Sequence, residues 1–354
     1  MALRVLSVDE LVQGGAGLGL NSSGRPEDSL LAVDLDGVGP EYPAGPLARA
    51  AQALNHPHVP VVGFAARPLS GPAGVLARAF DTTLVARAAD LGDRATVACD
   101  DVDQALDRLA LSVAARPITA TTLCQVVRLA PALNVADGLV VESLAYSMLL
   151  ASPEFWDWRA TTPRRELPPD SGHAGDLVAM TRDGDLLDVV LNNPNRRNAY
   201  SRRMRDGLLE ALELTALDPT LREVTLSGAG PSFCSGGDLD EFGTIDDVSA
   251  AHLIRLRQGT GAALEKVRDR VSARLHGACI GAGIEIPAFA AVVAAHADTT
   301  FRLPELAMGL IPGAGGTVSI TRRIGPWRTT WLALSGEAIG ADVALAWGLV
   351  DAVH

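Results

Sequence analysis

Lysine is nearly absent from this sequence, because Lys266 is the only one among 354 residues. A lysine Schiff base is therefore excluded at every other position. Cysteine is also scarce, and no two cysteines form a CxxC pair, which indicates reduced thiols in a cytoplasmic protein. The four cysteines are Cys99, Cys124, Cys234 and Cys279.

Long apolar runs and basic segments are lacking as well. The start, MALRVLSVDELVQ, has neither the basic residues nor the apolar core of a signal peptide. The most apolar run, near residues 284–297, is short and contains Glu285, so it predicts no transmembrane helix. With 42 acidic against 30 basic residues and a net charge of −12, neither nucleic acid nor an anionic membrane is expected as a partner.

The length and composition are typical of two domains. At 354 residues, of which 48% are hydrophobic, the chain can bury a sizeable core. Residues 161–175 are rich in proline, charge and glycine, which predicts a linker between an N-terminal domain, 29–160, and a C-terminal domain, 176–354. The glycines in 1–28 do not fit G-x-G-x-x-G and follow no clear strand, so a flexible start is expected.

Hydrophobic periodicity predicts alternating strands and helices. Residues 101–115 carry apolar side chains at i, i+3 and i+4, which indicates an amphipathic helix with Asp100 or Asp101 as its N-cap. Two apolar runs on either side of Asp183-Gly184 predict a β-hairpin. The other predicted helices are 46–54, 72–79, 118–129, 136–151, 198–217 and 250–267, and the other predicted strands begin at 29, 61, 82 and 223. This alternation is typical of an α/β fold.

One stretch, residues 281–317, concentrates the groups best suited to chemistry. Glu285 and Glu305 lie in apolar surroundings, where burial raises a carboxyl pKa toward neutrality and suits general acid–base catalysis. The turn Gly281–Gly283 precedes a helix-like run and can present free backbone N–H groups to a developing negative charge. Together these parts can make and protonate an enolate. A glutamate in an apolar helix can alternatively be a core residue paired with an arginine.

Five motifs follow one another in the second half of the chain. They are NPNRRNAYS (193–201), SFCSGGDLDEF (232–242), HGACIGAGIEIP (276–287), LPELAMGLIPGAGGT (303–317) and GEAIGADVALAWGLVDAV (336–353). With these motifs the second half resembles the crotonase, or enoyl-CoA hydratase/isomerase, superfamily. The resemblance implies a ββα spiral in the C-terminal domain, preceded by an α/β and helical N-terminal domain. It also implies an acyl-CoA thioester substrate and an enolate stabilised by two backbone N–H groups.

The resemblance assigns roles to individual residues. It implies that the N–H groups of Gly237 and Ala282 hold the thioester oxygen. It also implies that Glu285 activates the water that adds at Cβ and that Glu305 delivers the proton to Cα. Seven residues are implied to contact the substrate, the last two at the acyl end: Arg197, Ala199, Ser235, Asp238, Gly281, Gly313 and Gly316. No metal and no separate cofactor are implied, because coenzyme A is part of the substrate.

Two positions depart from the family pattern. Asp240 stands where many members carry a basic residue near the coenzyme A phosphates, and Ala291 stands where an aspartate usually follows the catalytic helix. Four arginines flank the first motif and either supply the missing positive charge or form a solvated helix start. They are Arg196, Arg197, Arg202 and Arg203.

The N-terminal half also resembles parts of this family. Residues 101–157 are similar to the helices that normally follow the core and drive trimerisation, and the sequence stops at His354, about where such helices would begin. Residues 59–86 resemble the family's strand, glycine turn and helix, with Val75 in the place of the first glutamate. We interpret residues 29–157 as a degraded crotonase-like half that caps the second half; the alternative is an unrelated α/β appendage. A homotrimer or hexamer is expected.

The resemblance and the glutamate pair favour hydration of a 2-enoyl-CoA, a lyase reaction of fatty acid metabolism. Isomerisation, cleavage or hydrolysis with one glutamate is an alternative within the family, as is cofactor-free oxygenation of an aryl-acetyl-CoA. A non-catalytic acyl-CoA-binding subunit is an alternative of another class. The presence of both Glu285 and Glu305 favours hydration over these alternatives.

Overall fold

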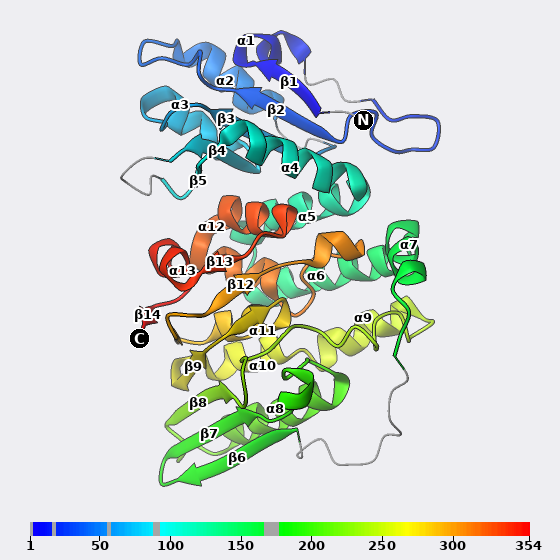
Figure 1. The fold of residues 1–354 in the computed structure, drawn as a ribbon, viewed down its shortest axis with the longest axis vertical. Helices are drawn as coiled ribbons and strands as arrows, with labels where there is room; N and C mark the ends of the chain where they lie inside the picture. The colour runs from blue at the N-terminus through cyan, green and yellow to red at the C-terminus, as the bar shows by residue number, and fades with distance from the viewer. Residues whose placement is uncertain (1–2, 16–18, 55–57, 88–92, 166–176) are drawn as a thin grey trace. The chain divides into compact units, whose positions relative to one another are not determined.

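The protein, seen in a computed structural model, divides into two compact units, and Figure 1 shows its fold with most helices and strands labelled. The first unit comprises Met1–Pro131 with Ile324–Gly336. The second unit comprises Ala132–Arg323 with Glu337–His354. The residues that the structure describes are 3–15, 19–54, 58–87, 93–165 and 177–354.

A five-stranded parallel sheet forms the centre of the first unit. Its strands are β1 (Leu3–Ser7), β2 (Leu30–Asp34), β3 (Val61–Ala65), β4 (Thr82–Ala86) and β5 (Val97–Cys99), and they follow the order of the chain. Strands β2, β3 and β4 are buried almost throughout, as expected for a parallel sheet covered by helices. The flexible start predicted for residues 1–28 is wrong over β1. This strand has only one fully buried residue, so it lacks the apolar run that marks β2, β3 and β4, and it pairs along its length with β2.

Helices connect and cover the strands of the first unit. They are α1 (Val8–Glu10), the π-helical turn η1 (Leu11–Gly15), α2 (Ala44–Ala53), α3 (Gly71–Leu76), η2 (Ala77–Ala79), α4 (Val102–Ala115), α5 (Pro117–Leu129) and η3 (Ala130–Ala132). Asp101 caps α4 as predicted, because its side chain accepts a hydrogen bond from the N–H of Gln104 at 2.9 Å. Asp81 binds two nitrogens of the Arg128 guanidinium and the N–H of Val61, and so ties α5 to the sheet.

Two sheets lie in the second unit. Their strands are β6 (Val178–Asp183), β7 (Leu186–Leu191), β8 (Glu223–Gly228), β9 (Val271–Leu275), β10 (Ala278–Ile280), β11 (Val292–Ala295), β12 (Thr300–Arg302), β13 (Ile339–Gly340) and β14 (Ala352–Val353). The larger sheet has the order β14-β11-β9-β8-β7-β6, and in it only β6 and β7 run antiparallel. The smaller sheet has the order β10-β12-β13. The predicted β6–β7 hairpin is present, but its turn is formed by Gly184-Asp185, one residue later than predicted, because Asp183 still pairs with Leu186; Gly184 has the positive φ, 61°, that suits a tight turn.

The helices of the second unit differ from the prediction at two places. They are α6 (Val135–Leu150), α7 (Pro153–Thr161), η5 (Pro194–Arg196), α8 (Arg202–Leu217), α9 (Val248–Arg257), α10 (Thr260–Val267), η6 (Arg268–Arg270), α11 (Ala282–Glu285), η7 (Pro287–Phe289), η8 (Glu305–Met308), the beginning of α12 (Gly316–Ser335) and α13 (Ala341–Trp347). From Ile324 onward, the residues of α12 belong to the first unit. Helix α8 begins at Arg202 rather than at Asn198, because Asn198 has a positive φ and Ser201 caps the helix. The helix predicted over 250–267 is two helices, α9 and α10, which Gly259 separates as the N-cap of α10.

Helices α6 and α7 belong to the second unit, although the sequence analysis assigned them to the N-terminal domain. Helix α6 packs on α9 and α10, and α7 packs on η8. The boundary predicted at 161–175 therefore falls inside the second unit, and its residues 166–175 lie outside the described structure. Amphipathic spacing shows that a helix buries one face but not which core covers that face.

Both units contain the order strand, helix, 3-10 helix, strand. In the first unit these elements are β3, α3, η2 and β4, and in the second they are β10, α11, η7 and β11. Val75, predicted in the place of the first glutamate, is 69% exposed on α3, whereas its neighbour Leu76 is only 2% exposed. Val75 is thus exposed, whereas Glu285, the glutamate whose place it was predicted to take, is 2% exposed.

A helix that crosses a bilayer is about 20 residues long and predominantly apolar. Taken singly, none of the described helices is both long and apolar enough to cross a bilayer. Two pairs of consecutive helices are long and apolar enough only when both helices of a pair are counted together, and each pair is sharply bent. They are Val102–Ala115 with Pro117–Ala132, and Val135–Leu150 with Pro153–Thr161.

Candidate active site

Glu285 and Glu305 follow two neighbouring strands of the smaller sheet. Strand β10 leads through Gly281 into α11, which ends at Glu285, and β12 is followed by η8, which begins at Glu305. Because β10 and β12 are paired in parallel, their carboxyl ends lie at the same edge of the sheet. The N–H of Gly281 donates a hydrogen bond to the carbonyl oxygen of Arg302 at 2.9 Å and joins the two turns. The topology therefore brings together two glutamates that are distant in sequence.

Gly281 provides the space that both carboxylates face. Its φ of 49° lies in the left-handed region, which favours glycine. A Cβ on this residue would lie 2.4 Å from Oε1 of Glu305 and 3.6 Å from Oε1 of Glu285. Any side chain here would collide with Glu305, so the two carboxylates themselves require glycine. The predicted pair thus borders one common space beside Gly281.

The two carboxylates differ in their hydrogen-bond partners. Oε2 of Glu285 accepts the N–H groups of Ala314 at 2.8 Å and Gly316 at 3.0 Å. Oε2 of Glu305 is buried and has no partner among the described residues. Donated N–H groups stabilise a carboxylate, whereas a buried oxygen without donors favours the protonated acid. Glu285 is therefore better suited to hold the negative charge, and Glu305 to hold the proton.

Burial raises the pKa of both carboxyl groups. Desolvation raises the pKa of Glu285 well above its usual range, the charges of Glu305 and of Glu142 on α6 raise it further, and the two N–H donors oppose this. Desolvation raises the pKa of Glu305 to about 8, against the opposing charge of Arg302. Since two buried charges repel each other, the pair is expected to retain one proton near neutral pH. The two N–H groups that Glu285 accepts favour its charged form, and so favour Glu305 as the group that holds the proton.

Two backbone N–H groups beside the glutamates are unpaired. Within the described part of the chain, the N–H groups of Gly237 and Ala282 donate no hydrogen bond. The turn that leads to Gly237 lies against the start of α11, because the N–H of Ile280 donates to the carbonyl oxygen of Cys234 at 3.1 Å. A Cβ on Gly283 would lie 2.2 Å from that same oxygen. Unpaired N–H groups in such a tight turn can stabilise an oxyanion.

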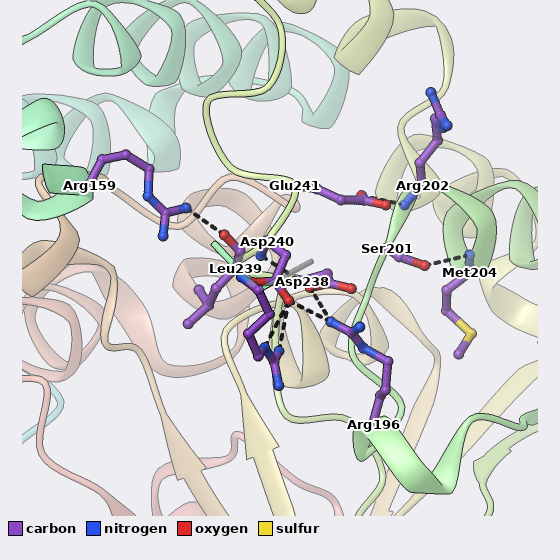
Figure 2. A network of polar contacts seen from close by, with 10 residues as sticks. Arg159, Arg196, Ser201, Arg202, Met204, Asp238, Leu239, Asp240 and Glu241 are labelled. Carbon is purple, nitrogen blue, oxygen red and sulfur yellow. Dashed lines mark hydrogen bonds and ion pairs between the residues drawn. The ribbon is translucent and has the colours of Figure 1, made fainter. Parts of the chain in front are cut away.

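An ionic network holds the turn that follows Gly237. Nη2 of Arg196 donates to Asp238 and to Asp240, each at 2.8 Å, as Figure 2 shows. Arg165 forms an ion pair with Asp240 at 2.9 Å and also donates its backbone N–H to it. Both aspartates are buried, so these arginines neutralise charges that would otherwise destabilise the fold.

Two arginines bind backbone carbonyls of the same turn: Arg159, near the end of α7, and Arg164, just after that helix. Nη1 of Arg159 donates to the carbonyl oxygen of Leu239 at 2.7 Å (Figure 2). Arg164 donates to the carbonyl oxygens of Phe242 and Gly243 at 2.9 and 2.7 Å. The end of α7 therefore fixes the segment directly after Gly237.

The second half of the chain matches a known family. The model described as enoyl-CoA hydratase/isomerase matches residues 181–354. The 2,3-dehydroadipyl-CoA hydratase of Escherichia coli (strain K12) is 34% identical over 176 residues, which are 50% of this chain and 68% of that protein. This chain belongs to the enoyl-CoA hydratase/isomerase family. The crotonase resemblance of the five motifs is thereby confirmed.

Other members of the hydratase/isomerase family are similar over the same half. Mevalonyl-coenzyme A hydratase SIDH of Beauveria bassiana (strain ARSEF 2860) is 32% identical over 182 residues, which are 47% of this chain and 62% of that protein. A crystal structure of enoyl-CoA hydratase from Thermoplasma volcanium GSS1 is 30% identical, with a TM-score of 0.46, over 51% of this chain and 72% of that chain. The chain thus spans about two thirds of the length of these relatives.

The three glycines predicted to contact substrate, Gly281, Gly313 and Gly316, face different side chains in the structure. Gly281 lies beside the two carboxylates, and Gly316 uses its N–H to bind Glu285. A Cβ on Gly313 would lie 2.3 Å from the ring of Tyr146, so Gly313 packs against that ring. Gly316 is therefore better described as a partner of Glu285 than as a lining of the acyl end.

The remaining predicted substrate contacts lie around residues 197–238. Arg197 is exposed, has a φ of 51°, and accepts the N–H of Ser235 at its carbonyl oxygen at 3.0 Å. Ala199 and Ser235 are half-buried. Asp238 is 5% exposed and paired with Arg196, so it stabilises the turn beside Gly237.

The structure explains why Asp240 stands where many members of the hydratase/isomerase family carry a basic residue. Asp240 is 3% exposed and paired with Arg165 and Arg196, so it belongs to the network under the turn. Of the two alternatives left open for the four arginines, the structure favours neither for Arg196, because Asp238 and Asp240 neutralise its charge in the network under the turn. Arg202 lies at the start of α8, where its backbone N–H donates to Glu241 at 2.7 Å (Figure 2).

Sequence reasoning missed Glu142, a third buried carboxylate of the site. It lies on α6, is 3% exposed, and binds the same glycine-rich segment as Glu285. The only signal in the sequence is one glutamate within the otherwise apolar run GLVVESLAY. Arg165 was also missed, because residues 161–175 were predicted to be a linker, in which a charged residue indicates no buried partner.

The buried carboxyl groups are expected to make stability fall at high pH. The raised pKa of Glu305 means that the folded protein favours its protonated form. The resulting stabilisation is fully present below the unfolded-state pKa and is lost as pH rises through about 8. The Glu305→Gln variant stays neutral, so its Tm at pH 9 should exceed that of the wild type by about 4 °C, and by less at pH 6. Thermal melts at both pH values measure this; an equal difference at both would contradict it.

Proposed function

We propose that this protein hydrates a 2-enoyl-CoA thioester. The observation that carries the proposal is the pair of buried carboxylates beside Gly281, one bound by two N–H groups and the other with an oxygen, Oε2, that has no partner among the described residues. Hydration needs one base and one acid at the same place, and this pair supplies both. Relatives described as 2,3-dehydroadipyl-CoA hydratase and mevalonyl-coenzyme A hydratase support the reaction class.

The proposed reaction uses the two carboxyl groups in sequence. The thioester oxygen accepts the N–H groups of Gly237 and Ala282, which stabilise the enolate as it forms. Glu285, as the carboxylate, takes a proton from water while the water oxygen bonds to Cβ. Glu305, as the acid, gives its proton to Cα, and the 3-hydroxyacyl thioester is released. One proton enters the pair and one leaves it, so the pair keeps a single proton overall.

An assay with a panel of 2-enoyl-CoA thioesters tests the proposal. Purified full chain is mixed with thioesters of short, medium, branched and carboxyl-terminated acyl groups. Loss of the conjugated enoyl-thioester absorbance measures hydration. We expect at least one member of the panel to be turned over at a rate far above background. Absence of turnover across the whole panel, with a folded protein, would refute the proposed activity.

We also propose a homotrimer, or a multiple of it, built on the second unit with α6 and α7. These helices pack on α9, α10 and η8, and α6 supplies Glu142 to the site. A fragment of residues 173–354 lacks both helices and leaves apolar surface uncovered, so it should be insoluble or inactive. Light scattering on the full chain tests the homotrimer, and solubility and activity of the fragment test the need for the two helices. A soluble, active and monomeric fragment would show that the N-terminal segment is dispensable.

A further inference from the structure

Four successive N–H groups at the start of α12 bind two glutamates in alternation. Along residues 314–317, the first and third donate to Glu285, and the second and fourth donate to Glu142. The hydroxyl of Thr317 also donates to Glu142, at 2.6 Å. The start of a helix favours negative charge, so both carboxylates occupy a position that stabilises them.

Glu142 comes from α6, outside the residues that match the family model. Both of its oxygens are hydrogen-bonded, one to Gly315 and the other to the N–H and hydroxyl of Thr317. Its titratable and charged neighbours are Tyr146 on α6, Arg255 and His252 on α9, Glu285 on α11 and Glu305 on η8.

Arg255 is the cation that faces Glu142 from α9. It donates to the hydroxyl of Ser143 at 3.2 Å and to that of Ser147, and its guanidinium lies 4.8 Å from the centre of the Tyr146 ring. His252 also binds the Ser143 hydroxyl, at 2.9 Å. These contacts hold α9 against α6 and keep Arg255 on the side of α6 that carries Glu142.

We propose that Glu142 is a positioning residue that aims the N–H groups of residues 314 and 316 at Glu285. The segment PGAGG has little conformational preference of its own, because glycine accepts many backbone geometries. Glu285 binds only alternate N–H groups of this segment, and Glu142 binds the others from α6. Held on both sides, the segment cannot rotate its donors away from Glu285. The inference rests on the proposed function only for its effect on turnover.

Glu142 also acts on the pair through its charge. Burial raises the pKa of Glu142 to about 7, while the hydrogen bonds from Thr317 and Gly315 and the charge of Arg255 oppose this. In its charged form Glu142 raises the pKa of Glu285 and of Glu305. Activity should rise with pH as Glu285 loses its proton and fall as Glu305 loses its own. Neutralising Glu142 should move both limbs of the pH profile to lower pH.

The first test compares Glu142→Gln with Glu154→Gln, a matched change at another buried glutamate, on α7. For Glu142→Gln we expect kcat to fall about 10–100-fold with KM changed less than about threefold. Both limbs should move down by roughly half a pH unit or more. Glu154→Gln should keep both limbs in place. A fall in kcat with unmoved limbs would reduce Glu142 to a merely structural residue and overturn the proposal.

A milder variant, Thr317→Val, covers the case in which Glu142→Gln does not fold. It removes one donor to Glu142, keeps the shape of the side chain, and leaves the backbone N–H in place. Losing this donor raises the pKa of Glu142, so the residue carries less charge at a given pH. We expect a smaller shift of both limbs in the same direction. A wild-type profile for Thr317→Val would count against the proposal.

The second test does not need activity. Hydrogen exchange is measured for the amides of residues 314–317 in the full-length wild type and in Glu142→Gln or, if that variant does not fold, in Thr317→Val. If Glu142 positions the segment, all four amides should exchange at least about tenfold faster in the variant. Faster exchange at residues 315 and 317 alone would show that Glu142 binds only its own donors. Absence of turnover in the wild type would refute the hydratase function, while this exchange pattern would still decide the role of Glu142.

Discussion

Replacing Glu285 by glutamine is expected to lower kcat by about 10²–10⁴-fold, because the base that activates water is lost. Glu305→Gln should cause a loss of similar size, because glutamine cannot deliver a proton to Cα. Glutamine retains an oxygen that can accept the N–H groups of Ala314 and Gly316, so the fold should be preserved. Steady-state kinetics with the best thioester of the panel gives the comparison.

Glu154→Gln is the matched control for both glutamate variants, since Glu154 is also buried in the second unit. Circular dichroism should show the same fold for all three variants. Near-native kcat in either active-site variant, together with an intact fold, would show that the two-acid mechanism is wrong.

Ala282→Pro is expected to lower kcat by about 10²–10³-fold, because it removes one of the two N–H groups that stabilise the enolate. Ala282 is the first residue of α11, a position that tolerates proline, and its N–H makes no hydrogen bond to any described residue. Removing that N–H therefore breaks no contact within the described fold. Turnover should fall far more than substrate affinity, because the hydrogen bond is strongest to the enolate.

Ala282→Gly is the control for this variant, because it changes the side chain and keeps the N–H. We expect it to retain kcat within about tenfold of the wild type. A folded Ala282→Pro protein with turnover equal to that of Ala282→Gly would remove Ala282 from the oxyanion site.

The sequence predicted the features that depend on local pattern. The α/β alternation, the Asp101 cap and the β6–β7 hairpin each follow from residues close together in the chain. Each of Glu285 and Glu305 directly follows a short strand, and the parallel pairing of these strands brings the two side chains together. The motifs HGACIGAGIEIP and LPELAMGLIPGAGGT contain the two glutamates, so the family resemblance pointed to both residues.

The features that the sequence did not predict depend on long-range packing. Glu142 and Gly315 are 173 positions apart, and only the placement of α6 in the second unit joins them. Arg165 and Asp240 are 75 positions apart, and neither has a periodic neighbour that indicates a partner. Hydrophobic spacing identifies a buried face but carries no information about which element covers it.

Hydration in water enriched with oxygen-18 tests the central claim most directly. The full-length protein is incubated with the 2-enoyl-CoA that it turns over fastest, and the product is analysed by mass spectrometry. The account predicts a 3-hydroxyacyl-CoA that carries one oxygen-18 atom at Cβ, with the thioester intact. An isomerised enoyl-CoA of unchanged mass, or free coenzyme A with a labelled carboxylic acid, would contradict it.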